Sequence, residues 1–407
     1  MLNPTVSHLP DYPFQRLTSL LSPHSPGGAV TNLALGEPQH PFPDFAVQAL
    51  LRDPQGFRRY PPTPGPDSLR GAIKAWIDQR YGLDTAMIDP QTMIHPVSGT
   101  REALFQLGQL CIPAQKAGQT PLVVFPDPFY QPYLGAALLN GAEPRGLPAQ
   151  RQTNHMPDFA SLSEADWARM AMIMVCSPAN PQGTTLSLED WKTLIQQARA
   201  SDTVLVADEC YSELYEDAPD GDGPPVGALE ACRALGGSLD NVLVVNSLSK
   251  RSNAAGLRSG FLCGDPALLA PWRRLRAYSQ AGTPLPLADA AIALWQDEAH
   301  VVENRRLYTE KRQAARALLG DRPGFEIAPN GFFLWLDVGA WGYDGEEAAL
   351  LLWQRHGLRT LPGRYMTLDP DDPNNPGQAY LRIALVHPID IVRPALDALA
   401  ETLLPRV

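Results

Sequence analysis

A lysine, Lys250, follows an apolar run at 242–246 and two small hydroxyl residues, Ser247 and Ser249, and Arg258 comes eight residues later. A lysine at the mouth of a buried strand is desolvated, which favours the neutral amine, and a neutral amine forms a Schiff base with an aldehyde. The serine hydroxyls and the Arg258 guanidinium are donors that suit a nearby phosphate. The stretch therefore fits an anchor for a phosphorylated aldehyde, although a solvated Lys–Arg pair on an ordinary loop has the same local pattern.

Polar and aromatic residues also follow other apolar runs. We predict buried strands at 122–125, 172–176, 204–207 and 242–246. Tyr130 comes shortly after the first of these runs, Asn180 after the second, and Asp208 with Tyr211 after the third. Near-continuous apolar strands that alternate with helices are typical of a parallel sheet covered on both faces, in which ligands bind at the carboxyl ends of the strands. The sequence thus predicts a binding site where these side chains meet.

Two glycines lie in segments that suit close contact with a ligand. Gly99, Thr100 and Arg101 precede a predicted amphipathic helix at 102–111, and free backbone N–H groups at a helix N-terminus are a ready anion site. Gly36 stands before Glu-Pro, where it lets the backbone approach a ligand, although a simple turn has the same sequence.

The pattern changes in the last third of the chain. We predict a long helical stretch with a bend at 287–319, followed by strands at the apolar runs 332–337 and 380–385. Two further helices are predicted at 346–356 and 388–404. We therefore expect an N-terminal arm that joins the small domain at 1–50, a large cofactor-binding domain at 51–290 and a small α+β domain at 291–407.

Composition excludes several classes of function. The chain has 407 residues, is 44% hydrophobic, and carries a formal charge of -11 with no basic run, which argues against a nucleic-acid partner. No stretch is apolar enough to span a membrane, and the start has no leader pattern. The five cysteines are odd in number and widely spaced, which suggests neither disulfides nor a metal site. We expect a cytoplasmic protein without a metal.

The order and spacing of the polar residues resemble those of the fold type I pyridoxal-phosphate aminotransferases of class I/II, over nearly the whole chain. The residues that carry this resemblance are Asn180-Pro181, Asp208, Tyr211, Ser247-Leu248-Ser249-Lys250, Arg258 and Arg382. The resemblance implies pyridoxal 5′-phosphate as cofactor. It also implies an α/β fold with a mostly parallel central sheet covered by helices, and a smaller α+β domain built from both chain ends.

Within this family the chain is most similar to the proteobacterial succinyldiaminopimelate transaminases of lysine biosynthesis. The motifs that carry this similarity are Tyr12-Pro13-Phe14, 99–105, 208–215, 247–253 and 295–301.

The resemblance implies a role for each residue around the cofactor ring. Lys250 would bond the cofactor and then act as the base that moves the substrate proton, and Asp208 would pair with the pyridine nitrogen. Asn180 and Tyr211 would bond the 3′-oxygen, and Tyr130 would stack on the ring, with Tyr133 as an alternative stacking residue.

The resemblance also implies how the phosphate and the substrate carboxylate are held. Arg382 would grip the α-carboxylate together with the Gly36 amide and Asn180. The phosphate would be bound by the set Gly99, Thr100, Arg101, Ser247, Ser249, Arg258 and, from the neighbouring subunit of a homodimer, Tyr60.

Two features depart from the family or stay open. The family's Pro-x-Gly-Gly-aromatic run appears at 329–333 as Pro-Asn-Gly-Phe-Phe, and we expect Asn330 to take over a positive-φ position. The distal carboxylates of a long substrate need cationic donors, for which Arg101, Arg251 and Arg364 are candidates.

The expected reaction converts N-succinyl-LL-2,6-diaminopimelate and 2-oxoglutarate to N-succinyl-2-amino-6-oxopimelate and glutamate. Alternatives with the same fold are aspartate, aromatic or acylornithine-type aminotransferases and a β-elimination lyase. A catalytically silent cofactor-binding module is a further alternative, but no DNA-binding segment precedes the fold and every expected catalytic position is filled.

Overall fold

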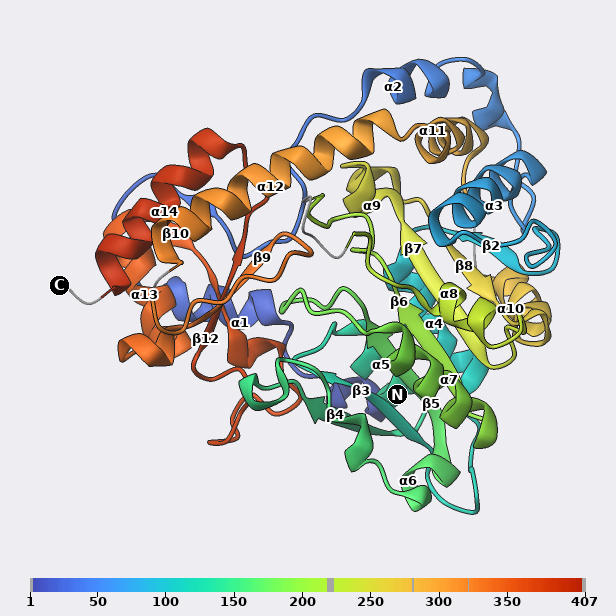
Figure 1. Ribbon diagram of the computed structural model, residues 1–407, viewed down its shortest axis with the longest axis horizontal. Coiled ribbons are helices and arrows are strands. Elements are labelled where there is room, and N and C mark those ends of the chain that lie inside the picture. Colours follow the sequence, from blue (N-terminus) through green and yellow to red (C-terminus); the bar gives the residue numbers. More distant parts are fainter. Residues whose placement is uncertain (1–2, 218–222, 280–281, 321, 405–407) are drawn as a thin grey trace.

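The computed structural model describes residues 3–217, 223–279, 282–320 and 322–404. Its central element is a seven-stranded sheet with the order β2-β8-β7-β6-β5-β3-β4 (Figure 1). Only β8 runs antiparallel to its neighbours, so the predicted mostly parallel sheet is confirmed. Its strands are β2 Ile94–Val97, β3 Leu122–Asp127, β4 Glu143–Pro148, β5 Met170–Cys176, β6 Val204–Asp208, β7 Val242–Ser247 and β8 Gly260–Gly264.

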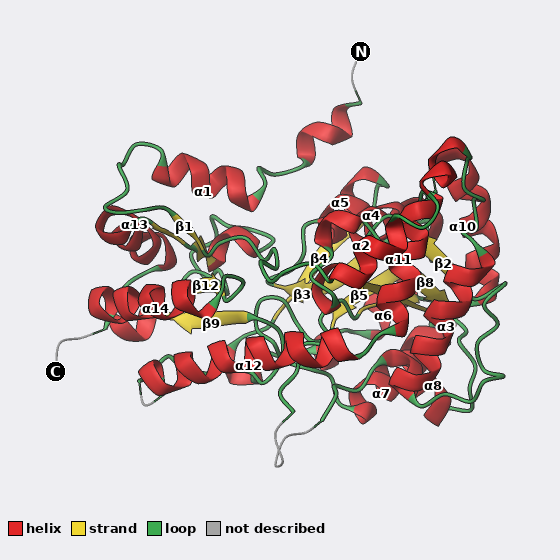
Figure 2. Cartoon of the chain, turned by 90° about the horizontal axis from the view of Figure 1, so that it is seen from above, coloured by secondary structure: helices red, strands yellow, loops and turns green. Residues whose placement is uncertain are grey.

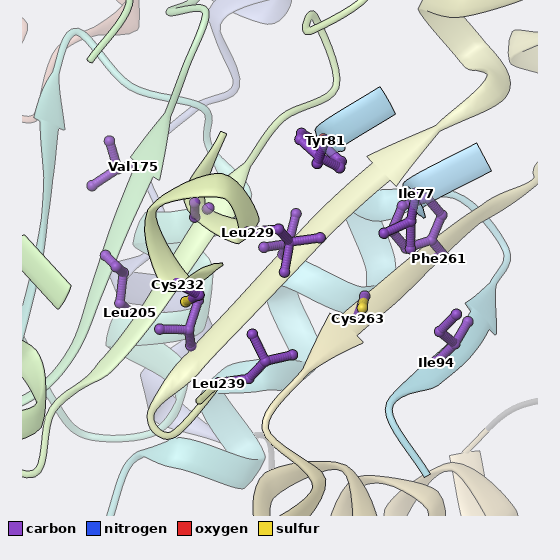
Figure 3. Packing of buried hydrophobic residues seen from close by; sticks show 14 of the residues in the cluster. Ile77, Tyr81, Ile94, Val175, Leu205, Leu229, Cys232, Leu239, Phe261 and Cys263 are labelled. Atoms are coloured by element: carbon purple, nitrogen blue, oxygen red, sulfur yellow. The ribbon is translucent and has the colours of Figure 1, made fainter. Parts of the chain in front are cut away.

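The strands are apolar throughout because both faces of the sheet are buried. Along β3, Leu122 and Val124 belong to one hydrophobic core, while Val123 and Phe125 belong to another on the opposite face. This alternation follows from the two-residue period of a strand. Figure 3 shows the packing of the first core, where Phe261 of β8 lies beside Ile77 of α3.

Helices cover the two faces of this sheet, as a parallel sheet requires. The first core is closed by α3 Asp67–Tyr81, α7 Leu188–Ala200, α8 Ala228–Ala234 and α11 Leu285–Gln296. The second core is closed by α4 Thr100–Cys111, α5 Pro132–Leu139 and α10 Pro266–Ser279. Three further helices flank the sheet, namely α2 Asp44–Leu50, α6 Glu164–Arg169 and the short α9 Leu248–Arg251.

A second, smaller set of elements has its own core. An antiparallel sheet of order β11-β12-β9 and a parallel pair β1-β10 pack against helices, and β1 and α1 come from the N-terminal end of the chain. Figure 2 shows α12 next to β9, with one end reaching toward the large group of elements. The elements are α1 Pro13–Leu21, β1 Thr31–Asn32, α12 Ala299–Leu319, β9 Phe333–Asp337, α13 Gly345–His356, β10 Leu358–Arg359, β11 Leu361–Pro362, β12 Tyr380–Ala384 and α14 Ile389–Leu403.

Two details of the C-terminal third can be compared with the sequence prediction. The bend expected in 287–319 is present, because α11 ends at Gln296 and α12 begins at Ala299. The expectation for Asn330 is wrong: Gly331, with φ 76°, has the positive φ, while Asn330 does not. The glycine that remains in the motif therefore makes the turn. Among the described helices, none is both long and apolar enough to cross a membrane.

Candidate active site

A cavity of about 520 Å³ opens at the carboxyl ends of β5, β6 and β7, between the large and small sheets. Its wall includes Asp208, the last residue of β6, and Ser247, the last residue of β7. The structure brings together most residues that the sequence singled out, since the lining contains Gly36, Thr100, Arg101, Tyr130, Asn180, Asp208, Tyr211, Ser247, Ser249, Lys250, Arg258 and Arg382.

Lys250 reaches across the cavity to the N-terminal segment of the chain. It lies on α9, which starts where β7 ends, and its amine donates a hydrogen bond to the Gly36 carbonyl oxygen. The Phe332 ring lies below the amine, with 5.3 Å between Nζ and the ring centroid. Burial lowers the pKa of Lys250 to about 8. The amine is therefore much closer to its neutral, nucleophilic form than an ordinary lysine at neutral pH.

Asp208 is a buried carboxylate with two hydrogen-bond donors. Its Oδ2 accepts from the Tyr133 hydroxyl at 2.8 Å, and its Oδ1 accepts from the Cys210 backbone N–H at 3.3 Å. Burial raises the pKa of Asp208, while these hydrogen bonds oppose the shift. Tyr133 thus supports the carboxylate, a contact that the sequence analysis missed when it considered Tyr133 as a stacking residue.

The other end of the cavity is built from α4, β7 and a turn after α9. Gly99 is the N-cap of α4 with φ 84°, and a Cβ at this position would lie 2.1 Å from Nη2 of Arg258. Arg258 donates to the Ser98 carbonyl at 3.0 Å and to the Ala255 carbonyl at 3.1 Å, and its exposed side chain lines the cavity. Ser247 Oγ donates to Ser249 Oγ at 2.7 Å. Only glycine allows the guanidinium to approach the helix N-terminus so closely.

Arg101 and Tyr130 form a pair on the open side of the cavity. The Arg101 Nε donates to the Tyr130 hydroxyl at 2.8 Å. Within the described part of the chain, the two terminal nitrogens of Arg101 have no hydrogen-bond partner. Burial raises the pKa of Tyr130 to about 12, so its hydroxyl stays protonated. The pair leaves half of a guanidinium available to an anion in the cavity.

Arg382 enters the cavity from β12, opposite Lys250. Its Nη1 donates to Asn180 Oδ1 at 3.0 Å, and its Nη2 donates to the Ala34 carbonyl at 2.6 Å. The guanidinium lies 4.4 Å from the Phe333 ring centroid, and its buried Nε has no partner among the described residues. Burial lowers the pKa of Arg382 to about 10, which still leaves it charged at neutral pH. An orphaned donor on a buried cation is a strong reason to expect an anionic ligand.

Tyr211 completes the wall between Asp208 and Arg382. Its ring lies 5.5 Å from the Phe332 centroid and 5.9 Å from the Phe333 centroid, and burial raises the pKa of its hydroxyl. Phe332 lies just before β9 and Phe333 is its first residue. Their sequence pattern predicted a strand and gave no sign that they contact residues of the site.

Two of the three arginines considered for a distal carboxylate are placed elsewhere. Arg251 is fully buried, ion-paired with Glu298, and packed on the Trp295 ring at 5.3 Å, so it supports the core and not the cavity. Arg364 contacts Glu346 and the Pro370 carbonyl outside the cavity lining. Their expected role is therefore wrong, and Arg101 remains. Tyr60 is fully exposed and does not line the cavity of its own chain.

The donor set fits pyridoxal phosphate. A helix N-terminus, two serine hydroxyls and the Arg258 guanidinium form one anion cradle, which a Cβ at Gly99 would fill. The buried Asp208 carboxylate suits a protonated ring nitrogen, and the Lys250 amine suits an aldehyde. The unpaired Nε of Arg382 leaves a second anion site for a substrate carboxylate.

Comparison with known proteins points independently to a pyridoxal-phosphate enzyme. The family model Aminotransferase class I and II matches residues 29–399. The 4-dedimethylamino-4-oxo-anhydrotetracycline transaminase OxyQ of Streptomyces rimosus is 33% identical over 384 residues, which are 92% of this chain and 95% of that protein. The LL-diaminopimelate aminotransferase of Desulforudis audaxviator is 28% identical, over 97% of this chain and 96% of its own.

A solved structure extends this likeness to three dimensions. The crystal structure of an aminotransferase from Neisseria meningitidis superposes with a TM-score of 0.91 and 36% identity, covering 99% of this chain and 100% of the other. The family match spans both sheets and the cavity between them. This chain therefore belongs to the class I and II aminotransferases, which have the type I fold and depend on pyridoxal phosphate.

Proposed function

We propose that the protein transfers the amino group of N-succinyl-LL-2,6-diaminopimelate to 2-oxoglutarate, a reaction of lysine and diaminopimelate biosynthesis. The observation that carries the proposal is a pair of arginines that line one cavity, Arg382 and Arg101, each with donor atoms that have no partner among the described residues. A substrate with carboxylates at both ends matches such a pair. The diaminopimelate specificity of several relatives supports the same class of substrate.

Arg382 holds the α-carboxylate of both substrates. Its guanidinium is already oriented by Asn180, the Ala34 carbonyl and the Phe333 ring, so little conformational entropy is lost when a carboxylate binds. Gly36, whose amide has no hydrogen-bond partner in the described part of the chain, lines the same cavity as Lys250 and accepts a hydrogen bond from its amine. Together they place the substrate Cα near that amine.

Lys250 moves the proton at Cα. When bound, pyridoxal phosphate supplies the carbonyl that exchanges with the amino group and the ring that withdraws electrons from Cα. Lys250, whose pKa burial lowers to about 8, is the base that takes the Cα proton and returns it at the cofactor C4′. Asp208 keeps the ring nitrogen protonated, and Tyr133 holds the Asp208 carboxylate in place. Asn180, Tyr211 and Tyr130 line the same cavity, where the first two would hold the 3′-oxygen of the cofactor and Tyr130 would pack on its ring.

The phosphate binds at the cradle formed by the backbone at Gly99, Thr100 and Arg101 and by the side chains of Ser247, Ser249 and Arg258. We further propose a homodimer in which the Tyr60 of each chain reaches the phosphate of the other. Tyr60 is fully exposed and follows the short segment Pro54–Arg58, where Phe57 is also exposed. Large exposed aromatic side chains on one segment favour burial against a partner.

Arg101 binds the distal, succinyl-bearing end. It stands at the mouth of the cavity, where the chain of a long substrate would leave the site, and Tyr130 fixes its orientation through Nε. Glutamate is shorter, so it depends less on this contact. The same arginine would discriminate between long and short dicarboxylates.

The test is a panel of amino donors offered to the purified enzyme with 2-oxoglutarate. N-succinyl-LL-2,6-diaminopimelate should react faster than LL-diaminopimelate, N-acetylornithine, aspartate or phenylalanine. A preference for unmodified LL-diaminopimelate would mean that this protein has the activity for which several relatives are named. A preference for aspartate or phenylalanine would show that Arg101 does not bind the distal end of a long substrate. Cystathionine, which carries a thiolate leaving group on Cβ, is offered separately, and release of pyruvate and ammonia from it without an oxo acid would instead identify a β-elimination lyase.

A further inference from the structure

One face of α12 carries buried polar residues that the proposed mechanism does not use. Asn304, Tyr308 and Lys311 are spaced by four and three residues, so they lie on one face of the helix. Their exposed fractions are 1%, 0% and 1%. This helix extends from α14 in the small group of elements to the end of α11 in the large group (Figures 1 and 2). A buried lysine and a buried asparagine are costly unless each is hydrogen-bonded, so their contacts need an explanation.

These residues form a directed chain of hydrogen bonds that ends on the backbone of Lys250. Asn304 Nδ2 donates to the carbonyl oxygens of Lys250 and Arg251, at 3.1 and 3.2 Å. Asn304 Oδ1 is then an acceptor, and it lies 2.8 Å from His40 Nδ1, which must donate. His40 Nε2 is therefore the acceptor of the bond from Lys311 Nζ at 2.6 Å. The contacts fix one tautomer of a neutral His40.

The chain closes a ring that holds Lys250 at both ends. The Lys250 amine donates to the Gly36 carbonyl, and Gly36 is four residues from His40 in one extended segment. His40 is bonded to Asn304, and Asn304 returns to the Lys250 carbonyl. Both the side chain and the backbone of the lysine are thus held to the same segment. Such a closed circuit limits rotation of α9 relative to that segment.

The same residues connect this ring to the strand that carries Arg382. Lys311 Nζ also donates to the Leu385 carbonyl at 3.0 Å, directly after β12. Gln39 N–H donates to the Val386 carbonyl at 3.2 Å. Tyr308 stacks on Phe332, with 5.3 Å between ring centroids, and Phe332 lies under the Lys250 amine. The α12 face therefore contacts the supports of both the lysine and the arginine.

The protonation states agree with this direction of donation. Burial and the nearby Lys311 lower the pKa of His40 to about 4, so it stays neutral and accepts at Nε2. Burial lowers the pKa of Lys311 to about 7, with Glu310 acting in the opposite sense, and Glu303 faces His40. Lysine donates in either protonation state, so the chain persists across the working pH range.

We propose that Asn304, His40 and Lys311 are positioning residues that fix the Lys250 amine relative to the Arg382 guanidinium. They touch neither substrate nor the reacting atoms, and they act through the backbone of Lys250 and the segment that begins at Gly36. The inference needs only the amino-group transfer itself, so it holds for any amino donor.

The test replaces chain members with apolar residues of similar size. Asn304→Leu and Lys311→Met should lower the limiting rate of each half-reaction by about ten- to hundredfold, because a displacement of about 1 Å has effects of this size. The half-saturating substrate concentration should change less than about twofold, since Arg382 keeps its own contacts. Lys116→Met is the matched control. Lys116 also donates to backbone carbonyls, of Met170, Ser201 and Asp202, but at the amino ends of β5 and β6.

Two further measurements separate positioning from general loss of stability. His40→Gln keeps one acceptor and one donor, so it should retain far more activity than His40→Leu. Hydrogen exchange of the complete enzyme should rise at 36–40 and 248–251 in Lys311→Met and not in Lys116→Met. If Asn304→Leu does not fold, Asn304→Ser, which is too short to reach both carbonyls, takes its place.

The proposal is overturned by any of three results. One is a limiting rate within about twofold of the unmodified enzyme in both folded variants. Another is a loss confined to substrate affinity. The third is equal activity of His40→Gln and His40→Leu.

Discussion

Replacing Arg382 by lysine tests the carboxylate clamp with the smallest change of charge. In the native structure the guanidinium is held by Asn180 Oδ1 at 3.0 Å, the Ala34 carbonyl at 2.6 Å and the Phe333 ring, and its Nε faces no protein acceptor among the described residues. A lysine ammonium is a point donor. It can keep one of these contacts but cannot also present a planar pair of N–H groups to a carboxylate.

The expected loss follows from the contacts that disappear. Losing a bidentate charge-assisted fork costs on the order of 2–3 kcal/mol in transition-state binding, or roughly 30- to 160-fold in kcat/KM. Burial adds to this loss. It already lowers the pKa of Arg382 to about 10, and it would also lower the pKa of a lysine at this position, which starts from a lower value than that of an arginine. The substituted side chain would therefore be partly neutral at neutral pH, and activity should fall as pH rises.

Single-turnover measurements of each half-reaction give the decisive comparison. Both half-reactions should lose a similar factor, because the amino donor and the oxo acid share the α-carboxylate. Arg359→Lys is the control: Arg359 lies on β10, outside the cavity lining, and contacts Thr18 Oγ1 at 2.6 Å. If Arg382→Lys lowers kcat/KM by less than about threefold in either half-reaction, the clamp is elsewhere.

Four other changes have defined outcomes. Lys250→Met should abolish turnover and yet raise the melting temperature of the cofactor-free protein at pH 7, because burial disfavours the charged amine. The gain in melting temperature should shrink between pH 8 and 10.5, where the folded protein has already released the Lys250 proton and the unfolded chain still holds it. Calorimetry across this pH range measures the change. Tyr133→Phe removes a hydrogen bond that lowers the pKa of Asp208, so the acid limb of the pH–rate profile should move to higher pH; an unchanged limb would separate Asp208 from that titration. Arg101→Ala should slow the half-reaction of the long substrate much more than that of glutamate, and equal losses would argue for a phosphate role alone. Tyr60→Ala should weaken cofactor binding measured by fluorescence titration in a protein that sediments as a dimer, whereas a fully active monomer would contradict the shared site.

The large sheet could be read from the sequence because its strands are buried on both faces. Continuous apolar runs at β3, β5, β6 and β7 are compatible with few structures other than buried strands, and the observed strands extend the predicted ones by only one or two residues. β4 was missed, since Glu143–Pro148 contains prolines and charges that an edge strand tolerates. Such a strand is defined by its pairing with β3 and not by its own composition.

The residues that end the strands were also identifiable, because their order in the chain carries a family resemblance. Which way each side chain points was not. Arg251 and Arg258 are seven residues apart in one motif, yet the first is buried against Trp295 while the second faces the cavity. The direction of the short helix α9 decides this, and that direction depends on packing against α11 and α12. A local sequence contains no information on those neighbours.

Contacts between distant segments belong to the tertiary structure alone. Tyr133 meets Asp208 because β3 and β6 end at the same edge of one sheet, and Arg382 faces Lys250 because the small sheet packs beside that edge. By sequence pattern Asn304 and Lys311 are helix residues and His40 is a loop residue. They form one hydrogen-bonded chain only because folding buries them side by side. The sequence determined which chemical groups are present and which elements carry them. Folding decided which groups meet, because pairing across hundreds of residues depends on sheet order and helix packing.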